Sequence, residues 1–281
     1  MFSSVTSRRF INRVFIALST LAFLIALVPL LSILYQTISR GFGALNFDFF
    51  TQITPPIGGA GGGIINAIEG SLTVVGIASL IGIPIGLFAG AYLYEYPGKV
   101  ANNLRLVAEV LTGVPSIVTG IVVYVVIVAT FHRFSAFAGG IALSFMMIPI
   151  VAISTHESLK TVPSSIKEGG LALGISRSKT LMYILVSTAK SGIITGIALS
   201  VARIMGETAP LLFTALGNQF MMNSIFEPAE SMTVLIYEYG TSPYPTAHAF
   251  AWGAALVLLL LVLGLNIVVR IASRLKPTTP I

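Results

Sequence analysis

The sequence predicts an all-α, polytopic membrane protein with six transmembrane helices. Hydrophobic residues make up 55% of its 281 residues, charged residues only 9%, and the mean hydropathy is +0.93. A soluble globular chain carries roughly a quarter charged residues. Several apolar runs also reach the roughly 20 residues needed to cross about 30 Å of hydrocarbon. Backbone groups in hydrocarbon must bond within their own segment, so these runs are expected to be helices.

The apolar runs place the six spans in order along the chain. The expected spans are 14–35, 64–93, 114–131, 136–153, 192–216 and 250–271. They divide the chain into three expected units. These are residues 1–63, with the first span and a glycine-rich outer loop, a helical core at 64–275, and a short C-terminal tail at 276–281.

The distribution of basic residues predicts the orientation of the spans. Lys and Arg concentrate in cytoplasmic loops close to the ends of spans. If both termini are cytoplasmic, 13 of the 16 Lys and Arg residues lie on the cytoplasmic side. Arg40 and Arg133 then lie outside, and Arg203 lies within a span. We therefore expect a multi-pass protein of the plasma membrane with both termini in the cytoplasm.

Several classes of function are disfavoured by what the sequence lacks. It has no cysteine, and its three histidines are scattered, so we expect no metal site. The net charge of +6 comes from residues that border apolar runs without interleaved aromatics, so nucleic acid is not an expected partner. The glycine-rich loop at 55–64 lacks a following GK[ST], so we expect a flexible connector and no nucleotide site.

The fifth span contains two charged residues, Arg203 and Glu207, four positions apart. An arginine at the centre of a span costs roughly 2.5 to 3.5 kcal/mol on insertion scales, which favours a function for it. The planar guanidinium can bind two oxygens of an anion at once. We therefore assign both residues to a substrate path, with Glu207 pairing with Arg203 at rest. The simpler alternative is a helix pair whose charges only neutralise each other.

Pro210 follows this pair and removes one helix hydrogen bond, so we expect a kink in the fifth span. The kink is a possible gate, and ordinary packing explains it equally well. A remote alternative is an intramembrane enzyme that uses Glu207 with a nearby Ser or His. No G-x-S-x-G, HExxH or aspartate pair lies in a span, so we expect no catalytic residues.

The long cytoplasmic stretch at 155–190 has the signals of two short helices joined by a tight turn. Pro163 suits a first helical turn, Gly174 suits the left-handed residue that ends a helix, and Ser176 is a plausible cap for the next. Gly169 and Gly170 would let another backbone approach closely. The residues alone leave two interpretations open, a hairpin that docks into a partner and a hairpin that lies on lipid.

The string "EGGLALG" at 168–174, followed by Ile184, resembles the EAA loop of bacterial ABC-importer permeases. That loop reads E-A-A, three residues, G, nine residues, then I-x-L-P. Here both alanines are glycines, and Val186 and Ser187 replace the closing L-P. The resemblance implies a type I ABC importer permease fold with an EAA-like loop at 156–190, between spans four and five. It also implies that Glu168, Gly169, Gly170 and Gly174 belong to a coupling helix that seats in a separate ATPase subunit.

Three further strings resemble the PstA-like phosphate permeases of this family. They are "YLYEYP" at 92–97, "GVPSIVTG" at 113–120 and "RIMGETAPLLFTALG" at 203–217. The resemblance implies a transport subunit for inorganic phosphate that forms half of a translocation path. It also implies a PstC-like second permease, a PstB-like ATPase dimer that binds ATP and Mg, and a PstS-like outer binding protein. Molybdate, tungstate or sulfate remains the alternative substrate.

Overall fold

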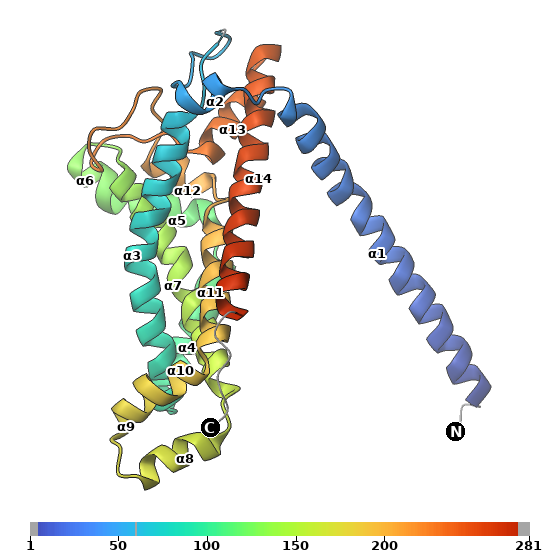
Figure 1. The fold of residues 1–281 in the computed structure, drawn as a ribbon, viewed down its shortest axis with the longest axis vertical. Coiled ribbons are helices and arrows are strands. Elements are labelled where there is room, and N and C mark those ends of the chain that lie inside the picture. Colours follow the sequence, from blue (N-terminus) through green and yellow to red (C-terminus); the bar gives the residue numbers. More distant parts are fainter. Residues whose placement is uncertain (1–4, 60, 275–281) are drawn as a thin grey trace.

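The structure is a computed structural model that describes residues 5–59 and 61–274 (Figure 1). Within these residues the regular secondary structure is helical, apart from one isolated bridge between Leu216 and Ala229. The prediction of an all-α protein is therefore confirmed. The tail predicted at 276–281 lies outside the described residues.

The described residues include four helices long and apolar enough to cross a membrane. They are α1 (Val5–Phe42), α3 (Ile65–Glu95), α7 (Ala136–Lys160) and α14 (Pro245–Arg274). Two bent helix pairs bring the number of possible spans to the predicted six. In one pair Lys99–Gly113 and Ser116–Phe131 meet at 101°, and in the other Arg177–Thr188 and Lys190–Ile204 meet at 74°.

The third span differs from the prediction because a helix precedes it. The sequence predicts a loop up to residue 113, whereas the structure has helix α4 (Lys99–Gly113) there. Its apolar residues recur at helical spacing, with Lys, Asn, Arg and Glu on the other side, so a hydropathy window alone misses it. After the bend the chain continues as α5 (Ser116–Val123), the π-helical turn η1 (Tyr124–Val128) and α6 (Ala129–Phe131).

The fifth span is also interrupted. It is predicted as one helix over 192–216, but α11 (Lys190–Ile204) ends early and α12 (Ala209–Thr214) begins after four residues. The fourth span is longer than predicted, since α7 continues to Lys160. Both differences arise because hydropathy reports burial in lipid and not the position at which the helical hydrogen bonds stop.

Helices α3 and α7 pack tightly along one seam. A Cβ atom at Gly82 would lie 2.9 Å from the sulfur of Met147, and one at Gly86 would lie 2.6 Å from Cβ of Val151. Small residues at every fourth position thus let the two helices approach more closely than larger side chains allow. The buried core of the bundle is built around this pair.

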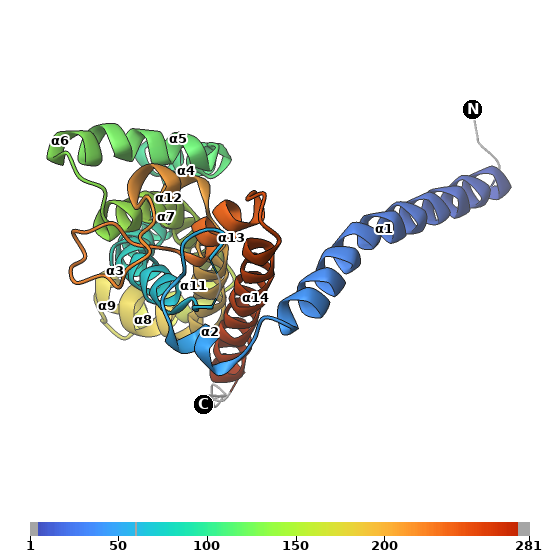
Figure 2. The same ribbon diagram turned by 90° about the horizontal axis from the view of Figure 1, so that it is seen from above.

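Helix α1 diverges from the rest of the bundle over most of its length (Figures 1 and 2). It joins the bundle at its C-terminal end, where Gly41 lies against the backbone of Trp252 in α14. The Arg40 guanidinium lies 5.3 Å from the centre of the Trp252 ring. The apolar side chains along the middle of α1 are exposed, as expected for a helix surrounded by lipid.

The two ends of the bundle carry different short elements (Figure 1). At one end lies a hairpin, residues 163–188, which we call the α8–α10 hairpin. It consists of α8 (Ser164–Ala172), α9 (Arg177–Lys179), the π-helical turn η2 (Thr180–Leu185) and α10 (Val186–Thr188). The opposite end carries α2 (Phe47–Thr51), α13 (Met232–Gly240) and the longer loops.

The start of the glycine-rich loop is bonded to its surroundings, in contrast to the flexible connector predicted from sequence. The Thr54 hydroxyl donates to Oδ1 of Asn66 over 2.7 Å. The Tyr239 hydroxyl donates to the carbonyl of Pro55. Gly58 adopts φ +86° beside the ring of Tyr244, so its left-handed conformation serves a packed turn.

Candidate functional site

Arg203 and Glu207 lie on either side of the point where α11 stops. Arg203 is in the last turn of α11 and is exposed, whereas Glu207 lies in the four-residue break before α12 and is half-buried. Because the helix ends at Ile204, the two side chains do not share a helix face, and no ion pair joins them. The pairing at rest expected from sequence is therefore absent from this structure. No hydrogen bond or ion pair joins the Arg203 guanidinium to another side chain of the described residues, so its five N–H donors are available to another acceptor.

The break is held by two contacts from other parts of the chain. The Thr233 hydroxyl, in the first turn of α13, donates to the backbone carbonyl of Glu207 over 2.9 Å. Pro210 lies at the start of α12 and does not kink a continuous helix, because the helical bonds stop before it. It is buried against Gly120 of α5, where a Cβ atom would lie 2.7 Å from its Cα. Pro210 is thus a packing contact between α12 and α5, and its role as a gate stays a prediction.

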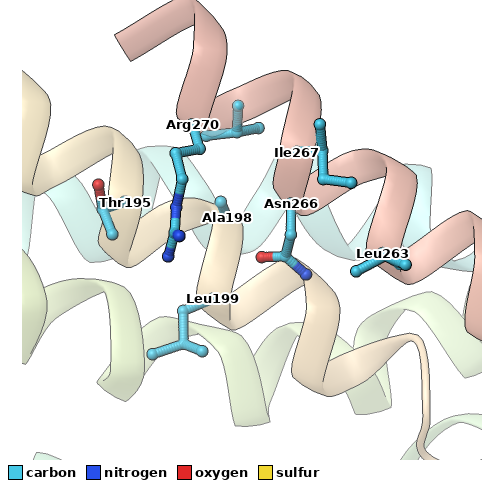
Figure 3. Close-up of a pocket in the computed structure, with 8 residues that line it drawn as sticks. Thr195, Ala198, Leu199, Leu263, Asn266, Ile267 and Arg270 are labelled. Carbon is cyan, nitrogen blue, oxygen red and sulfur yellow. The ribbon is translucent and has the colours of Figure 1, made fainter. Parts of the chain in front are cut away.

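A cavity of about 420 Å³ lies between α11 and α14 (Figure 3). Its polar lining consists of Thr195, Asn266 and Arg270, and Figure 3 shows the Arg270 side chain reaching toward α11. On α11, Leu199 also lines the cavity and is four residues before Arg203, so these two side chains fall on one side of the helix. The cavity therefore extends the exposed side of α11 from Arg203 toward the hairpin end. This cavity was not predicted from the sequence, although Asn266 within an apolar span was a visible signal.

Glu230 lies in the loop before α13 and is only 4% exposed. Its Oε1 accepts a hydrogen bond from the backbone N–H of Ser231 over 3.1 Å. Burial raises the pKa of the Glu230 carboxyl to about 8, and the negative charge of Glu238 acts in the same direction. Glu230 is therefore a buried carboxyl group that holds its proton more tightly than one in water.

The α8–α10 hairpin confirms the predicted pair of short helices joined by a tight turn. Gly174 has φ +76°, the left-handed conformation expected after a helix. Glu168 and Gly169 are exposed, and a Cβ atom at Gly169 would meet nothing within 4 Å. Gly170 is buried, and a Cβ atom there would lie 2.9 Å from Cγ2 of Thr180. Glu168 and Gly169 therefore lie on an accessible surface, whereas Gly170 sets the spacing inside the hairpin.

Glu95, at the end of α3, connects the hairpin to the bundle and was missed by the sequence analysis. It is only 3% exposed. The Lys167 ammonium lies 2.8 Å from Oε2, and Nε of Arg177 lies 3.2 Å from Oε1. Both cations come from the hairpin, and Lys167 is 72 residues away along the chain. The charged residue within "YLYEYP" was a signal, but its partners could not be inferred from their separation.

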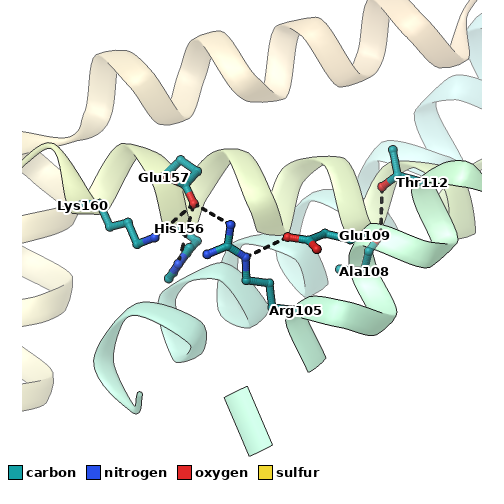
Figure 4. A network of polar contacts seen from close by, with 7 residues as sticks. All are labelled: Arg105, Ala108, Glu109, Thr112, His156, Glu157 and Lys160. Atoms are coloured by element: carbon teal, nitrogen blue, oxygen red, sulfur yellow. Dashed lines mark hydrogen bonds and ion pairs between the residues drawn. The ribbon is translucent and has the colours of Figure 1, made fainter. Parts of the chain in front are cut away.

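A second charged network joins α4 to α7 at the same end of the bundle (Figure 4). Nε of Arg105 lies 2.8 Å from Glu109, and its Nη2 lies 3.5 Å from Glu157. Lys160 lies 3.3 Å from the same Glu157 oxygen. These side chains are 41 to 49% exposed, so water screens their interactions. This network differs from the Glu95 cluster chiefly in its exposure.

Comparison with known proteins identifies close relatives over nearly the whole chain. The "Phosphate transport system permease protein PstA" of Haemophilus influenzae is 43% identical over 262 residues, which cover 92% of this chain and 93% of that protein. The "Probable phosphate transport system permease protein PstA" of Methanocaldococcus jannaschii is 36% identical, with 96% of both chains covered.

Solved structures with the same fold are permeases of other ABC transporters. A bacterial ABC transporter involved in the import of the acidic polysaccharide alginate has a chain with a TM-score of 0.64, 16% identity, and coverage of 94% of this chain and 96% of that one. An inward-facing MetNI methionine ABC transporter has a chain with a TM-score of 0.60 and 18% identity, and the match covers 75% of this chain and 92% of that one. At this level of identity, the likeness establishes the fold alone.

A family match covers most of the bundle. Residues 82–276 match the family described as "Binding-protein-dependent transport system inner membrane component". These residues include α7, the α8–α10 hairpin, the break after α11 and the cavity beside α14. Taken with the relatives above, this match shows that the chain belongs to the family of inner-membrane components of binding-protein-dependent transport systems, together with the PstA permeases.

Proposed function

We propose that this chain is a transmembrane permease subunit of an ATP-driven importer of inorganic phosphate, and that it forms half of the translocation path. The observation that carries the proposal is an exposed arginine, Arg203, at a helix break inside the bundle of a chain whose relatives are phosphate permeases. A guanidinium offers paired N–H donors that match two phosphate oxygens. Its position within a membrane bundle is costly unless it serves a partner or an aqueous path.

The path that we propose follows the exposed side of α11. An anion would meet Arg203 beside the break and then enter the cavity lined by Thr195, Asn266 and Arg270. Hydroxyl, amide and guanidinium groups can all donate hydrogen bonds to phosphate. The half-buried Glu207 lies next to this route and would keep the anion from binding too tightly, because its charge repels the anion.

ATP-driven import requires partner proteins, because a single permease chain of this kind forms only half of the translocation path. A permease of this family works with an ATPase and a binding protein. We propose a PstC-like second permease, a PstB-like ATPase dimer that binds ATP and Mg²⁺, and a PstS-like phosphate-binding protein. The exposed surface at Glu168 and Gly169 supports docking of the ATPase on the α8–α10 hairpin. The hairpin end is then cytoplasmic, in agreement with the cytoplasmic termini predicted from the basic residues.

The test is uptake of radiolabelled phosphate in a strain that lacks its own permease of this type. Arg203→Gln should abolish uptake at membrane levels matched to the wild type. Glutamine has neither the positive charge nor the paired N–H donors of the guanidinium. Arg203→Lys should keep part of the uptake, because the charge remains. Arg13→Gln, a change in the exposed part of α1, is the matched control and should leave uptake intact.

Competition assays identify the anion. Excess unlabelled phosphate should suppress uptake, whereas molybdate, tungstate and sulfate should not. Full uptake by Arg203→Gln at normal membrane level would remove Arg203 from the path. If one of the other oxyanions suppresses uptake strongly and phosphate suppresses it only weakly, that oxyanion and not phosphate is the substrate.

A further inference from the structure

Glu95 is a buried carboxylate whose two cationic partners both come from the α8–α10 hairpin. The side chain of Lys167 is 23% exposed and its ammonium also lies 5.1 Å from the centre of the Tyr94 ring. The side chain of Arg177 is 64% exposed, so water weakens its attraction to Glu95. Lys167 is therefore the principal partner. Removing one member of a buried pair leaves an uncompensated charge, so such a contact resists separation.

Apolar side chains also join the hairpin to the bundle, but they constrain it differently. Leu159, Leu181 and Leu185 form a buried cluster with Ala91 of α3. Contacts of this kind have no preferred direction and allow small sliding movements. A hydrogen bond from Lys167 to one oxygen of Glu95 has a fixed geometry. The charged contact can thus fix the position of the hairpin along α3, whereas the apolar cluster only holds it against the bundle.

Movement of α3 would be transmitted to α7. A Cβ atom at Gly90, less than two turns before Glu95, would lie 2.6 Å from Cβ of Thr155 in α7. The same close packing continues at Gly86 and Gly82. Close-packed elements move together because any separation forfeits many contacts at once. Helices α3 and α7 thus form one rigid pair.

At the other end of α3, two hydrogen bonds connect this pair to the break beside Arg203. The Ser71 hydroxyl oxygen accepts a hydrogen bond from the backbone N–H of Met232 over 2.8 Å. The next residue, Thr233, donates to the carbonyl of Glu207. A continuous set of contacts therefore extends from the hairpin, along α3, to the end of α11.

We propose that Glu95 is a positioning residue that fastens the α8–α10 hairpin to α3, so that a displacement of the hairpin by the ATPase moves α3 and α7 as one body and shifts the break at Met205–Thr208. This inference rests on the proposed function, because it takes the hairpin as the docking site of an ATPase. Glu95 itself contacts neither substrate nor nucleotide. Its effect is on the number of phosphate ions moved for each ATP hydrolysed.

The first experiment measures this ratio in the complete complex, reconstituted in liposomes with its ATPase, second permease and binding protein. Glu95→Gln keeps the shape of the side chain and removes its charge. We expect normal assembly, retained ATP hydrolysis, and a fall in phosphate moved per ATP of about five- to tenfold, at the lower end of allosteric couplings. Glu95→Asp should restore part of the ratio. Glu109→Gln, which removes an exposed carboxylate from the other charged network, is the matched control and should behave as wild type.

A wild-type ratio for Glu95→Gln in fully assembled complexes would overturn the inference. If Glu95→Gln does not assemble, Lys167→Gln and Arg177→Gln serve instead. Lys167→Gln should lower the ratio more than Arg177→Gln, because Lys167 is the less exposed partner. Normal ratios in both would also overturn the inference.

A distance measurement tests the attachment without any assumption about the transported anion. The chain has no cysteine, so Leu80→Cys on α3 and Tyr183→Cys on the hairpin, both at strongly exposed residues, give two defined sites for spin labels. We expect the distance between the labels to stay constant when ATP is added to the wild-type complex and to change with ATP in Glu95→Gln. A distance that changes with ATP in the wild type would overturn the attachment. Failure of phosphate uptake by the wild type would refute the proposed substrate and leave this measurement valid.

Discussion

Gly120 of α5 lies directly against Pro210 of α12, so that a Cβ atom on the glycine would be 2.7 Å from the proline Cα and 3.1 Å from its carbonyl oxygen. Because the obstructing atoms belong to the backbone, they cannot rotate away. The contact joins two segments that are 90 residues apart and fixes α12 immediately after the break beside Arg203. The geometry of the break therefore depends on a residue that no charge or hydropathy pattern marks.

Gly120→Ala should destabilise the protein by about 1 to 3 kcal/mol, the usual cost of overpacking a close contact. The measurement is thermal unfolding of the purified protein in detergent. Gly113→Ala is the matched control, because a Cβ atom at Gly113 would meet nothing within 4 Å. Equal unfolding temperatures for the two variants would show that α5 and α12 can move apart without loss of thermal stability.

Thr233→Val should destabilise the break, because valine keeps the shape of threonine but leaves the Glu207 carbonyl without its side-chain donor. The expected loss is about 0.5 to 1.5 kcal/mol, the net contribution of one hydrogen bond. Thr233→Ser keeps the hydroxyl and should recover most of this loss. Thermal unfolding and phosphate uptake should be measured together. If valine and serine variants behave alike in both, the hydrogen bond has no role in holding the break.

The pKa of Glu230 predicts how stability depends on pH. Burial, helped by the charge of Glu238, raises the pKa of this carboxyl from 4.5 to about 8, so the folded protein binds its proton more tightly than the unfolded chain. The stabilisation is complete below about pH 4.5 and is lost as the pH rises through about 8. Unfolding temperatures recorded between these limits should fall with pH in the wild type.

Glu230→Gln should flatten this decline, since glutamine has no proton to lose. Glu227→Gln changes a partly buried carboxylate of the same loop and serves as the control, which should keep the wild-type slope. Burial also raises the pKa of Glu238, so a residual slope of the same sign should remain in Glu230→Gln. An unchanged slope in Glu230→Gln would assign the pH dependence to other groups.

Gly169 and Gly170, which replace the two alanines of the EAA pattern, should respond differently to substitution by alanine. Gly169→Ala meets open space and should stabilise α8 by up to roughly 1 kcal/mol, the difference in helix propensity. At Gly170 the added methyl would lie 2.9 Å from Cγ2 of Thr180, and this contact should cancel the gain. Thermal unfolding of both variants gives the comparison. A higher unfolding temperature for Gly170→Ala than for Gly169→Ala would contradict the close packing of α8 on η2.

Local patterns were sufficient to predict much of the fold. The long apolar runs predicted α3, α7 and α14, because hydropathy over some 20 residues depends only on neighbours in sequence. The turn at Gly174 was predictable because its left-handed conformation is favourable mainly for glycine. Helix α4 was missed because its charged residues lower the hydropathy of a segment that is nevertheless helical.

The candidate site was predicted only in part. The charges of Arg203 and Glu207 mark an unusual membrane segment, and this is visible in the sequence alone. Their mutual arrangement was not, because apolar segments lie on both sides of residues 205–208, and hydropathy does not show that the helical hydrogen bonds stop between them. Hydropathy has the same value for a helical residue and for one in a break. The Thr233 hydroxyl, which satisfies a carbonyl of the break, comes from another helix.

The sequence by itself determined that this chain is a helical membrane protein with a short helical hairpin, since both properties follow from hydropathy and backbone preferences over a few turns. Only the tertiary structure decided that Arg203 and Glu207 are not paired with each other. It also decided that the carboxylate of Glu95 holds the hairpin to α3. The physical reason is that ion pairs and close contacts depend on distances in space. Residues separated by 72 or more positions are brought together only by the packing of the whole bundle.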